Sequence, residues 1–281
     1  MDDKYNQLVR LLISCCPKGI VLGFSGGVDS TFLLAILSMI RQKTPFPFAA
    51  VMMYSSFQKE QERNEAALLA KKYDVPFFLQ EYDPLSIPEI KFNSRERCYF
   101  CKMHFFTGIR EFAQKRKIEL VIDGTNADDR RKYRPGLRAI KELGIRSPLA
   151  ECGLTKEDIR GISRKLGIPT AEKTAEPCLA TRFEYGMELT PENLKLVSMG
   201  ESVIRSFVPD VPELRLRIER KSARIELSPD WIPVLLRQEP KLQKEMERLG
   251  FTGIAIDPQG YRSGSFDKNN DRSDFKTLPT F

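Results

Sequence analysis

The sequence predicts an α/β fold, a doubly wound parallel sheet followed by a smaller α+β domain. In the first part, short apolar runs alternate with longer stretches of helical spacing, and a glycine-serine turn joins the first run to the first helix. After about residue 185 the pattern changes to a capped helix, an alternating hairpin, and a last helix and strand. We therefore place a large domain at 1–185, an α+β domain at 186–267 and a polar tail at 268–281.

The predicted elements of the large domain alternate along the chain. The strands lie within residues 19–24, 48–56, 75–82 and 117–125, and the helices within residues 30–40, 58–74 and 102–117. In the small domain, residues 190–207 predict a helix capped by Thr190, residues 213–229 a hairpin, and residues 240–261 a helix and a strand. Ligands of doubly wound sheets bind beyond the carboxyl ends of the strands, so the loop after the first strand is the expected active-site loop.

Composition and charge limit the class of protein. The 281 residues carry 45 basic and 38 acidic side chains, a net charge of +7 that suits a nucleotide or RNA partner or, alternatively, is simply a basic solvated surface. The beginning of the chain does not read as a signal peptide, and no long apolar run is present, so we expect a soluble, cytoplasmic protein. Six cysteines are too few for a disulfide scaffold in a chain of this length.

The loop Ser-Gly-Gly-Val-Asp-Ser at residues 25–30 predicts phosphate binding. Gly26 and Gly27 let the backbone approach a ligand, and the following helix offers its positive end. The lysine of a Walker A loop is absent, and the alternative is a glycine turn with a helix cap. The loop matches instead the motif of PP-loop ATP pyrophosphatases, and this resemblance implies that the loop holds the pyrophosphate of ATP and that Asp29 helps to place Mg²⁺. The pyrophosphate residues it implies are Ser25, Gly26, Gly27 and Ser30.

The residues that follow the last predicted strand are expected at the same edge of the sheet as the phosphate loop. Gly124 and Asp129 are predicted to line the nucleotide site, and Asp128 precedes Asp129. The alternative for the two aspartates is a solvated acidic turn.

Further motifs make the chain similar to the LarE family of PP-loop sulfur transferases over nearly its whole length. They are RCYFCK (97–102), DGTNADD (123–129), residues 133–149, LTKEDIR (154–160), EPCLATRF (176–183) and DPQGYRSGSFD (257–267). The resemblance implies a reaction on pyridinium-3,5-biscarboxylic acid mononucleotide, in nickel-pincer cofactor biosynthesis. ATP activates a carboxylate as its acyl adenylate, and sulfur delivery then gives a thiocarboxylate.

The resemblance also assigns the sulfur chemistry to Cys178. In some LarE proteins this cysteine gives up its own sulfur; in others it joins a C-x-x-C pair, here Cys98 and Cys101, as a ligand of a 4Fe-4S cluster. The three-cysteine pattern of this chain favours the cluster. The residues alone also allow a zinc site that includes His104, or a redox dithiol.

The resemblance implies a set of substrate residues as well. They are Lys102, Arg182, Glu201, Arg215, Arg217 and Glu226. Arg215 and Arg217 are the implied ligands of the substrate phosphate, although their alternation with leucines equally suits a solvent face. Roles for Glu201 and Glu226 are not assigned.

Two other classes of function are compatible with parts of the sequence. A PP-loop enzyme that thiolates tRNA would share the adenylation chemistry, but the sequence contains no recognisable RNA-binding module. An ATP-binding module without activity would not need three cysteines in these motifs. The resemblance implies a homo-oligomer, commonly a hexamer, that acts on a small nucleotide, takes sulfide from a donor, and has neither a membrane nor a nucleic acid as partner.

Overall fold

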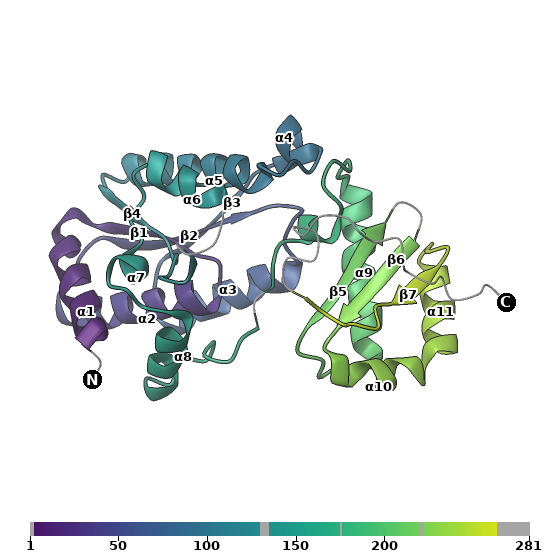
Figure 1. The fold of residues 1–281 in the computed structure, drawn as a ribbon. Coiled ribbons are helices and arrows are strands. Elements are labelled where there is room, and N and C mark those ends of the chain that lie inside the picture. The colour runs from purple at the N-terminus through teal and green to yellow at the C-terminus, as the bar shows by residue number, and fades with distance from the viewer. Residues whose placement is uncertain (1–2, 130–134, 175, 220–221, 263–281) are drawn as a thin grey trace. The chain divides into compact units, whose positions relative to one another are not determined.

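The computed structural model describes residues 3–129, 135–174, 176–219 and 222–262. The chain forms two compact units, of which the first contains residues 1–90 and 95–175 and the second residues 91–94 and 176–281. Each unit has its own sheet (Figure 1). The predicted polar tail at 268–281 lies outside the described residues.

The first unit contains a four-stranded parallel sheet, which confirms the predicted fold class. Its strands are β1 (Ile20–Gly23), β2 (Phe48–Tyr54), β3 (Phe77–Glu81) and β4 (Leu120–Ile122), in the spatial order β3-β2-β1-β4. The chain leaves β1 toward β2 on one side and reaches β4 on the other. The loops after β1 and β4 therefore meet at the point where the strand order reverses, which is the usual ligand position in such sheets.

Helices cover both faces of this sheet (Figure 1). One core contains residues of α1 (Asp3–Cys15), α2 (Val28–Lys43), α3 (Glu60–Lys72), α7 (Pro148–Glu151) and α8 (Lys156–Lys165). The other contains residues of α5 (Arg97–Lys115) and α6 (Pro135–Glu142). Alternate residues of β1 serve the two cores: Ile20 and Leu22 pack in the first and Val21 in the second.

Six described helices of the first unit differ from the sequence expectation, because α5 starts earlier than predicted and α1, α4 (Pro88–Lys91), α6, α7 and α8 were not predicted. The predicted helix at 102–117 starts earlier, at Arg97, so Cys98 and Cys101 both lie in its first turns. An unpredicted helix, α1, opens the described chain and buries Leu8, Leu12 and Cys15 along one face. The short helix α4 precedes α5.

The second unit is an α+β arrangement, as predicted. Strands β5 (Leu214–Glu219) and β6 (Ser222–Leu227) are antiparallel, and β7 (Ile254–Ile256) pairs parallel to β6. Its helices are α9 (Pro191–Phe207), α10 (Ile232–Leu236) and α11 (Glu239–Arg248). The Thr190 hydroxyl caps α9, accepting from the Asn193 N–H at 3.2 Å. None of the helices in the described ranges is long and apolar enough to span a bilayer.

Candidate functional site

The predicted phosphate loop follows β1 and turns directly into α2. Gly26 has φ +69°, and a Cβ there would lie 3.2 Å from the Ala66 Cβ, so glycine suits both the backbone and the available space. Gly27 is the N-cap of α2, and its carbonyl accepts the first bond of the helix, from the Thr31 N–H. The preceding N–H groups of the first turn have no acceptor within the helix, which leaves them available to an anion.

Two serine hydroxyls hold the loop in shape. Ser25 Oγ lies 3.1 Å from Ser30 Oγ, and the Gly27 N–H donates to Ser25 Oγ at 3.4 Å. Ser30 Oγ in turn donates to the Gly27 carbonyl at 3.3 Å. Ser25 is exposed at the loop surface, whereas Ser30 is buried beneath it. These hydrogen bonds fix the shape of the loop.

Asp29 is the acidic residue of this loop and lies in the first turn of α2. Its Oδ2 accepts from Lys156 Nζ at 2.7 Å and from Asn126 Nδ2 at 3.4 Å. Its Oδ1 is buried and has no hydrogen-bond partner in the structure. Burial raises the pKa of the Asp29 carboxyl above its ordinary value, against the opposing effect of Lys156. A buried carboxylate oxygen without a partner is suited to a divalent cation.

The loop after β4 lies against the phosphate loop. A Cβ on Gly124 would be 3.1 Å from the Ser30 nitrogen, so glycine permits this close approach. Asn126 Oδ1 accepts the N–H groups of Asp128 at 2.9 Å and Asp129 at 3.2 Å, forming a tight polar turn. The predicted residues Gly124 and Asp129 are therefore brought to the same edge of the sheet as Asp29.

Asp128 has a structural contact of its own. Its Oδ2 accepts from the Lys156 backbone N–H at 2.8 Å, at the first residue of α8. A carboxylate at this position favours the start of a helix, because it meets the positive end of the helix dipole. This contact places the base of the Lys156 side chain beside the phosphate loop.

Cys98 and Cys101 lie in the first turns of α5, three residues apart on one helix face. Cys98 is exposed and Cys101 half-buried, and Cys101 Sγ is 3.0 Å from the Tyr82 hydroxyl. Lys102 follows them, with its Nζ 5.0 Å from the centre of the Phe106 ring. A Cβ on Gly136 would be 3.0 Å from Lys102 Cγ and 3.3 Å from the Cys98 carbonyl, so α6 packs tightly against this turn.

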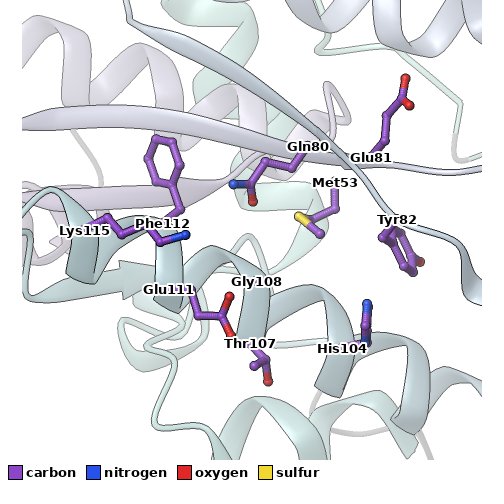
Figure 2. A pocket seen from close by; sticks show the side chains of 10 residues that line it. All are labelled: Met53, Gln80, Glu81, Tyr82, His104, Thr107, Gly108, Glu111, Phe112 and Lys115. Carbon is purple, nitrogen blue, oxygen red and sulfur yellow. The ribbon is translucent and has the colours of Figure 1, made fainter.

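A groove of about 450 Å³ lies beside Cys101, between β3 and α5 (Figure 2). Tyr82 and His104 face one another there with ring centres 5.4 Å apart. Gly108 and Met53 both line the groove. Glycine fits here because a Cβ at residue 108 would lie only 3.1 Å from Met53 Cε. The side chain of His104, which the sequence allowed as a zinc ligand, is exposed and stacks on Tyr82.

Cys178 belongs to the second unit, where it is half-buried and precedes the 3-10 turn Leu179–Arg182. Arg182, at 1% exposure, donates from Nη1 to the Pro177 carbonyl at 2.6 Å. Its Nε and Nη2 pair with the two oxygens of Glu201, at 2.8 and 3.2 Å. The two predicted substrate residues Arg182 and Glu201 are thus a buried ion pair that holds the Cys178 segment.

The other predicted substrate residues lie on the β5-β6 hairpin of the second unit. Arg215 and Arg217 are 3% and 5% exposed, so the alternative of a solvent face is wrong. Arg217 Nε donates to Glu226 Oε2 at 2.9 Å, and its Nη1 donates to the Thr181 carbonyl at 2.6 Å. The Arg215 guanidinium lies 5.1 Å from the centre of the Tyr261 ring.

Ion pairs link Arg217, Glu226, Arg224 and Asp257 in the interior of the second unit, separately from the Arg182–Glu201 pair. Arg224 Nη1 bridges Glu226 at 2.8 Å and Asp257 at 2.6 Å. Burial, with Arg182 as a further cause, lowers the pKa of the Arg215 guanidinium, and burial also lowers the pKa of Arg217 despite Glu226. Four arginines (Arg182, Arg215, Arg217 and Arg224) face three carboxylates (Glu201, Glu226 and Asp257), which leaves an excess of one positive charge. Such a group is suited to an anion.

The two cysteine segments belong to different units, Cys98 and Cys101 to the first and Cys178 to the second. Within the described part of the chain, no three His, Cys, Asp or Glu side chains form a group that could hold a metal ion. The structure thus brings together the predicted phosphate loop residues and, separately, the predicted residues of the hairpin.

The parallel sheet, its switch point and the Ser-Gly-Gly-Val-Asp-Ser loop define an ATP-dependent enzyme of the PP-loop pyrophosphatase class. The sequence profile of the NAD synthase family matches residues 3–92, which contain this loop. Three full-length relatives extend the likeness beyond it.

An uncharacterized protein of Synechocystis sp. is 34% identical over 250 residues, which cover 88% of this chain and 91% of the relative. An uncharacterized protein of Methanocaldococcus jannaschii is 33% identical over 246 residues, 88% of this chain and 92% of the relative. Pyridinium-3,5-bisthiocarboxylic acid mononucleotide synthase of Lactiplantibacillus plantarum is 31% identical over 262 residues, 93% of this chain and 92% of the relative. The chain belongs to the LarE family of PP-loop sulfur transferases.

Sequence reasoning did not select three polar residues of the phosphate site. Asn126 links the turn after β4 to Asp29, Lys156 pairs with Asp29, and Lys173 Nζ donates to the Gly26 carbonyl at 3.2 Å. The asparagine two residues before Asp128 was a readable signal, since such residues form local turns. Lys156 lies 127 residues after Asp29, and Lys173 lies 147 residues after Gly26. No local sequence pattern predicts these contacts.

Proposed function

We propose that the protein adenylates a carboxylate of pyridinium-3,5-biscarboxylic acid mononucleotide and converts it to a thiocarboxylate, in nickel-pincer cofactor biosynthesis. The observation that carries the proposal is the match to the Lactiplantibacillus plantarum synthase, which extends over 93% of this chain and includes both the phosphate loop and the hairpin. The excess positive charge on the hairpin face supports an anionic substrate of this kind.

The first step uses the phosphate loop. A substrate carboxylate oxygen attacks the α-phosphorus of ATP, the bond to the β-phosphate breaks, and pyrophosphate leaves. The N–H groups of the first turn of α2, with Ser25 and Ser30, would bind the leaving group and stabilise its charge. Asp29 would hold Mg²⁺, and the buried Oδ1 without a partner fits that role. Bound Mg²⁺ supplies neutralisation of phosphate charge.

The second step replaces AMP by sulfur at the acyl carbon. A sulfur nucleophile attacks this carbon, the bond to the AMP oxygen breaks, and a thiocarboxylate remains. We assign the sulfur to the segment of Cys178, whose backbone carbonyls accept from Arg182. Arg182 therefore acts as a positioning residue through the Cys178 turn.

We further propose that Cys98, Cys101 and Cys178 hold a 4Fe-4S cluster. Two thiols three residues apart on one helix face, one of them exposed, fit two of the thiolate ligands. Such a cluster supplies an iron without a protein ligand, which can carry sulfide. With this arrangement Cys178 is retained through turnover, and a separate donor provides the sulfide.

The adenylation proposal is tested with Asp29→Ala. We expect the variant to lose AMP and pyrophosphate formation with ATP and the pyridinium substrate, because its metal ligand is gone. Asp210→Ala, at an exposed position of the second unit, is the control. Normal AMP production by folded Asp29→Ala would contradict the proposed role of the loop.

The sulfur proposal is tested with single serine variants of Cys98, Cys101 and Cys178, purified without oxygen. We expect iron content and thiocarboxylate formation to fall together in each, while pyrophosphate release survives. Cys152→Ser, a half-buried cysteine outside these motifs, is the control. If Cys178 itself is sacrificed, mass spectrometry will instead find dehydroalanine at this position after one turnover, and Cys98→Ser will stay active.

A PP-loop enzyme that thiolates tRNA is the second candidate, which the net charge of +7 permits. Pyrophosphate release stimulated by tRNA, and not by the pyridinium nucleotide, would favour it. We also propose that the protein is a homo-oligomer, as large as a hexamer, which light scattering tests directly.

A further inference from the structure

Tyr82 contacts the sulfur of one of the two cysteines on α5. Its hydroxyl oxygen lies 3.0 Å from Cys101 Sγ, which is hydrogen-bond distance, and Cys101 is half-buried. Cys98, one turn earlier on the same helix, is exposed, and its sulfur lies 3.8 Å from Arg97 Nη2. The two thiols therefore have different surroundings, and the tyrosine contacts the more buried one.

The Tyr82 side chain is held from several sides. Its backbone N–H donates to the Tyr54 carbonyl at 3.1 Å, next to the last pair of residues of β2 and β3. Its ring packs on the core that contains residues of α5 and α6, and it stacks on His104 with 30° between the ring planes (Figure 2). His104 lies one turn after Cys101 on α5, so the ring and the hydroxyl contact the same helix face. The hydroxyl is thereby directed at the sulfur.

The direction of this hydrogen bond depends on the state of the sulfur. While Cys101 is a thiol, both groups carry a proton, and the 3.0 Å distance suits donation in either direction. A cysteine binds a metal as its thiolate and then has no proton to give. Of these two groups, only the Tyr82 hydroxyl can then donate. The contact is thus kept when the sulfur becomes a metal ligand.

A hydrogen bond to a metal-bound sulfur changes the properties of the metal site. The donor draws negative charge from the sulfur, so the sulfur gives less of it to the metal. Hydrogen bonds to the sulfurs help to set the reduction potential of iron-sulfur sites, and they raise it because the reduced form carries more negative charge. A site with less negative charge also attracts an anion such as sulfide more strongly.

We propose that Tyr82 is a positioning residue of the sulfur site and acts through Cys101. Its hydroxyl donates to the Cys101 thiolate, fixes the direction of this ligand and draws negative charge from it. The inference rests on the proposed iron-sulfur site, and it adds a residue from the end of β3 that none of the sequence motifs contains.

The test uses the full-length protein, purified without oxygen and reconstituted with iron and sulfide. Tyr82→Phe removes the hydroxyl and keeps the ring that stacks on His104. Tyr99→Phe is the matched control, because this tyrosine directly follows Cys98 on α5 and donates to Glu142 Oε2 at 2.6 Å. A redox titration followed by electron paramagnetic resonance measures the reduction potential of each protein.

We expect a more negative potential in Tyr82→Phe than in the wild type, and the wild-type potential in Tyr99→Phe. Loss of iron from folded Tyr82→Phe, with iron retained by Tyr99→Phe, would also support the inference. A wild-type potential in Tyr82→Phe at full iron content would overturn it, as would equal shifts in the two variants.

The infrared S–H stretch of the iron-free protein separates this inference from the proposed cluster. The Cys101 band is the one that Cys101→Ala removes, and we expect Tyr82→Phe to shift it and Tyr99→Phe to leave it in place. An unshifted band in Tyr82→Phe would overturn the inference, because the hydroxyl and the sulfur would then not be in contact. Wild-type protein that takes up no iron, together with a shifted band, would contradict the cluster and still support the contact of Tyr82 with Cys101.

Discussion

Arg182 and Glu201 form a two-point ion pair in the interior of the second unit. Arg182 Nε and Nη2 lie 2.8 and 3.2 Å from the two oxygens of Glu201, and the side chains are 1% and 2% exposed. The same arginine donates to the carbonyls of Pro177 and Cys178. The pair therefore connects α9 to the turn that carries the proposed sulfur residue.

Glu201→Gln should lower the free energy of unfolding by about 3 kcal/mol or more, because it leaves a buried guanidinium without its counter-charge. Urea denaturation measures the effect. Glu245→Gln is the control: its partner Arg248 is 61% exposed, and such a surface pair contributes about 1 kcal/mol or less. Equal losses in the two variants would show that the Arg182 charge is compensated by other groups.

Gly26→Ala should reduce both stability and ATP binding. The φ of +69° strains any other residue by about 1 kcal/mol, and the added Cβ would press on Ala66. Gly144→Ala has a similar φ of +65° but nothing within 4 Å of its Cβ, so it measures the strain alone. We expect Gly26→Ala to lose more stability than Gly144→Ala, by the cost of the Ala66 contact, and only Gly26→Ala to raise the KM for ATP. An unchanged KM would show that the loop tolerates displacement.

Arg215→Ala should weaken binding of the pyridinium nucleotide by about 1.5–3 kcal/mol and leave ATP binding unchanged, because its expected partner is the substrate phosphate. Arg217→Ala should act in the same direction, but it also removes one of the two arginine partners of the buried Glu226 and is best combined with Glu226→Gln. Titration with each nucleotide separately measures the difference. Parallel losses for the two ligands would show that the hairpin arginines are wrongly assigned.

Asp158 supplies a prediction for the pH dependence of stability. Burial acts to raise the pKa of this carboxyl, but hydrogen bonds from Lys4 Nζ and from the Thr155 backbone N–H together leave it below its ordinary value. A carboxyl with a lowered pKa in the folded state stabilises the fold above its unfolded pKa of about 3.9, and this contribution disappears as the pH falls through the folded value.

Asp158→Asn should therefore lower the free energy of unfolding by about 1 kcal/mol or less at pH 7 and by less than that at pH 3. Denaturation of both proteins at the two pH values measures the difference. An equal loss at both values would assign the effect to the shape of the capping turn rather than to its charge.

The sequence was informative wherever a local pattern has a local physical cause. The phosphate loop was predictable because glycines, a serine and a helix start follow one another, and the Thr190 cap because threonine precedes Pro191. Burial of Arg215 was not predictable, since alternation along a strand separates two faces without saying which of them is covered.

The other pairings that the sequence did not predict depend on contacts between distant segments of the chain. Lys156 reaches Asp29 because α8 packs beside α2, and its backbone N–H, at the start of α8, donates to Asp128. The pairing of Arg182 with Glu201 likewise depends on how α9 lies on its sheet. Charges of this kind read as ordinary surface residues until the packing of the elements is known.

The short stretch 91–94 has a practical consequence for dividing the gene. Asn93 donates from Nδ2 to the carbonyls of Phe183 at 3.0 Å and Glu184 at 2.7 Å, and the Gly186 N–H donates back to its carbonyl at 3.2 Å. A recombinant fragment that starts at residue 176 would lack this asparagine, although it would contain every strand of the second sheet. A single cut in the gene therefore cannot isolate the whole second unit, because Asn93 is encoded within the first. A fragment that contains the whole second unit would need residues 91–94 joined to the segment that starts at residue 176.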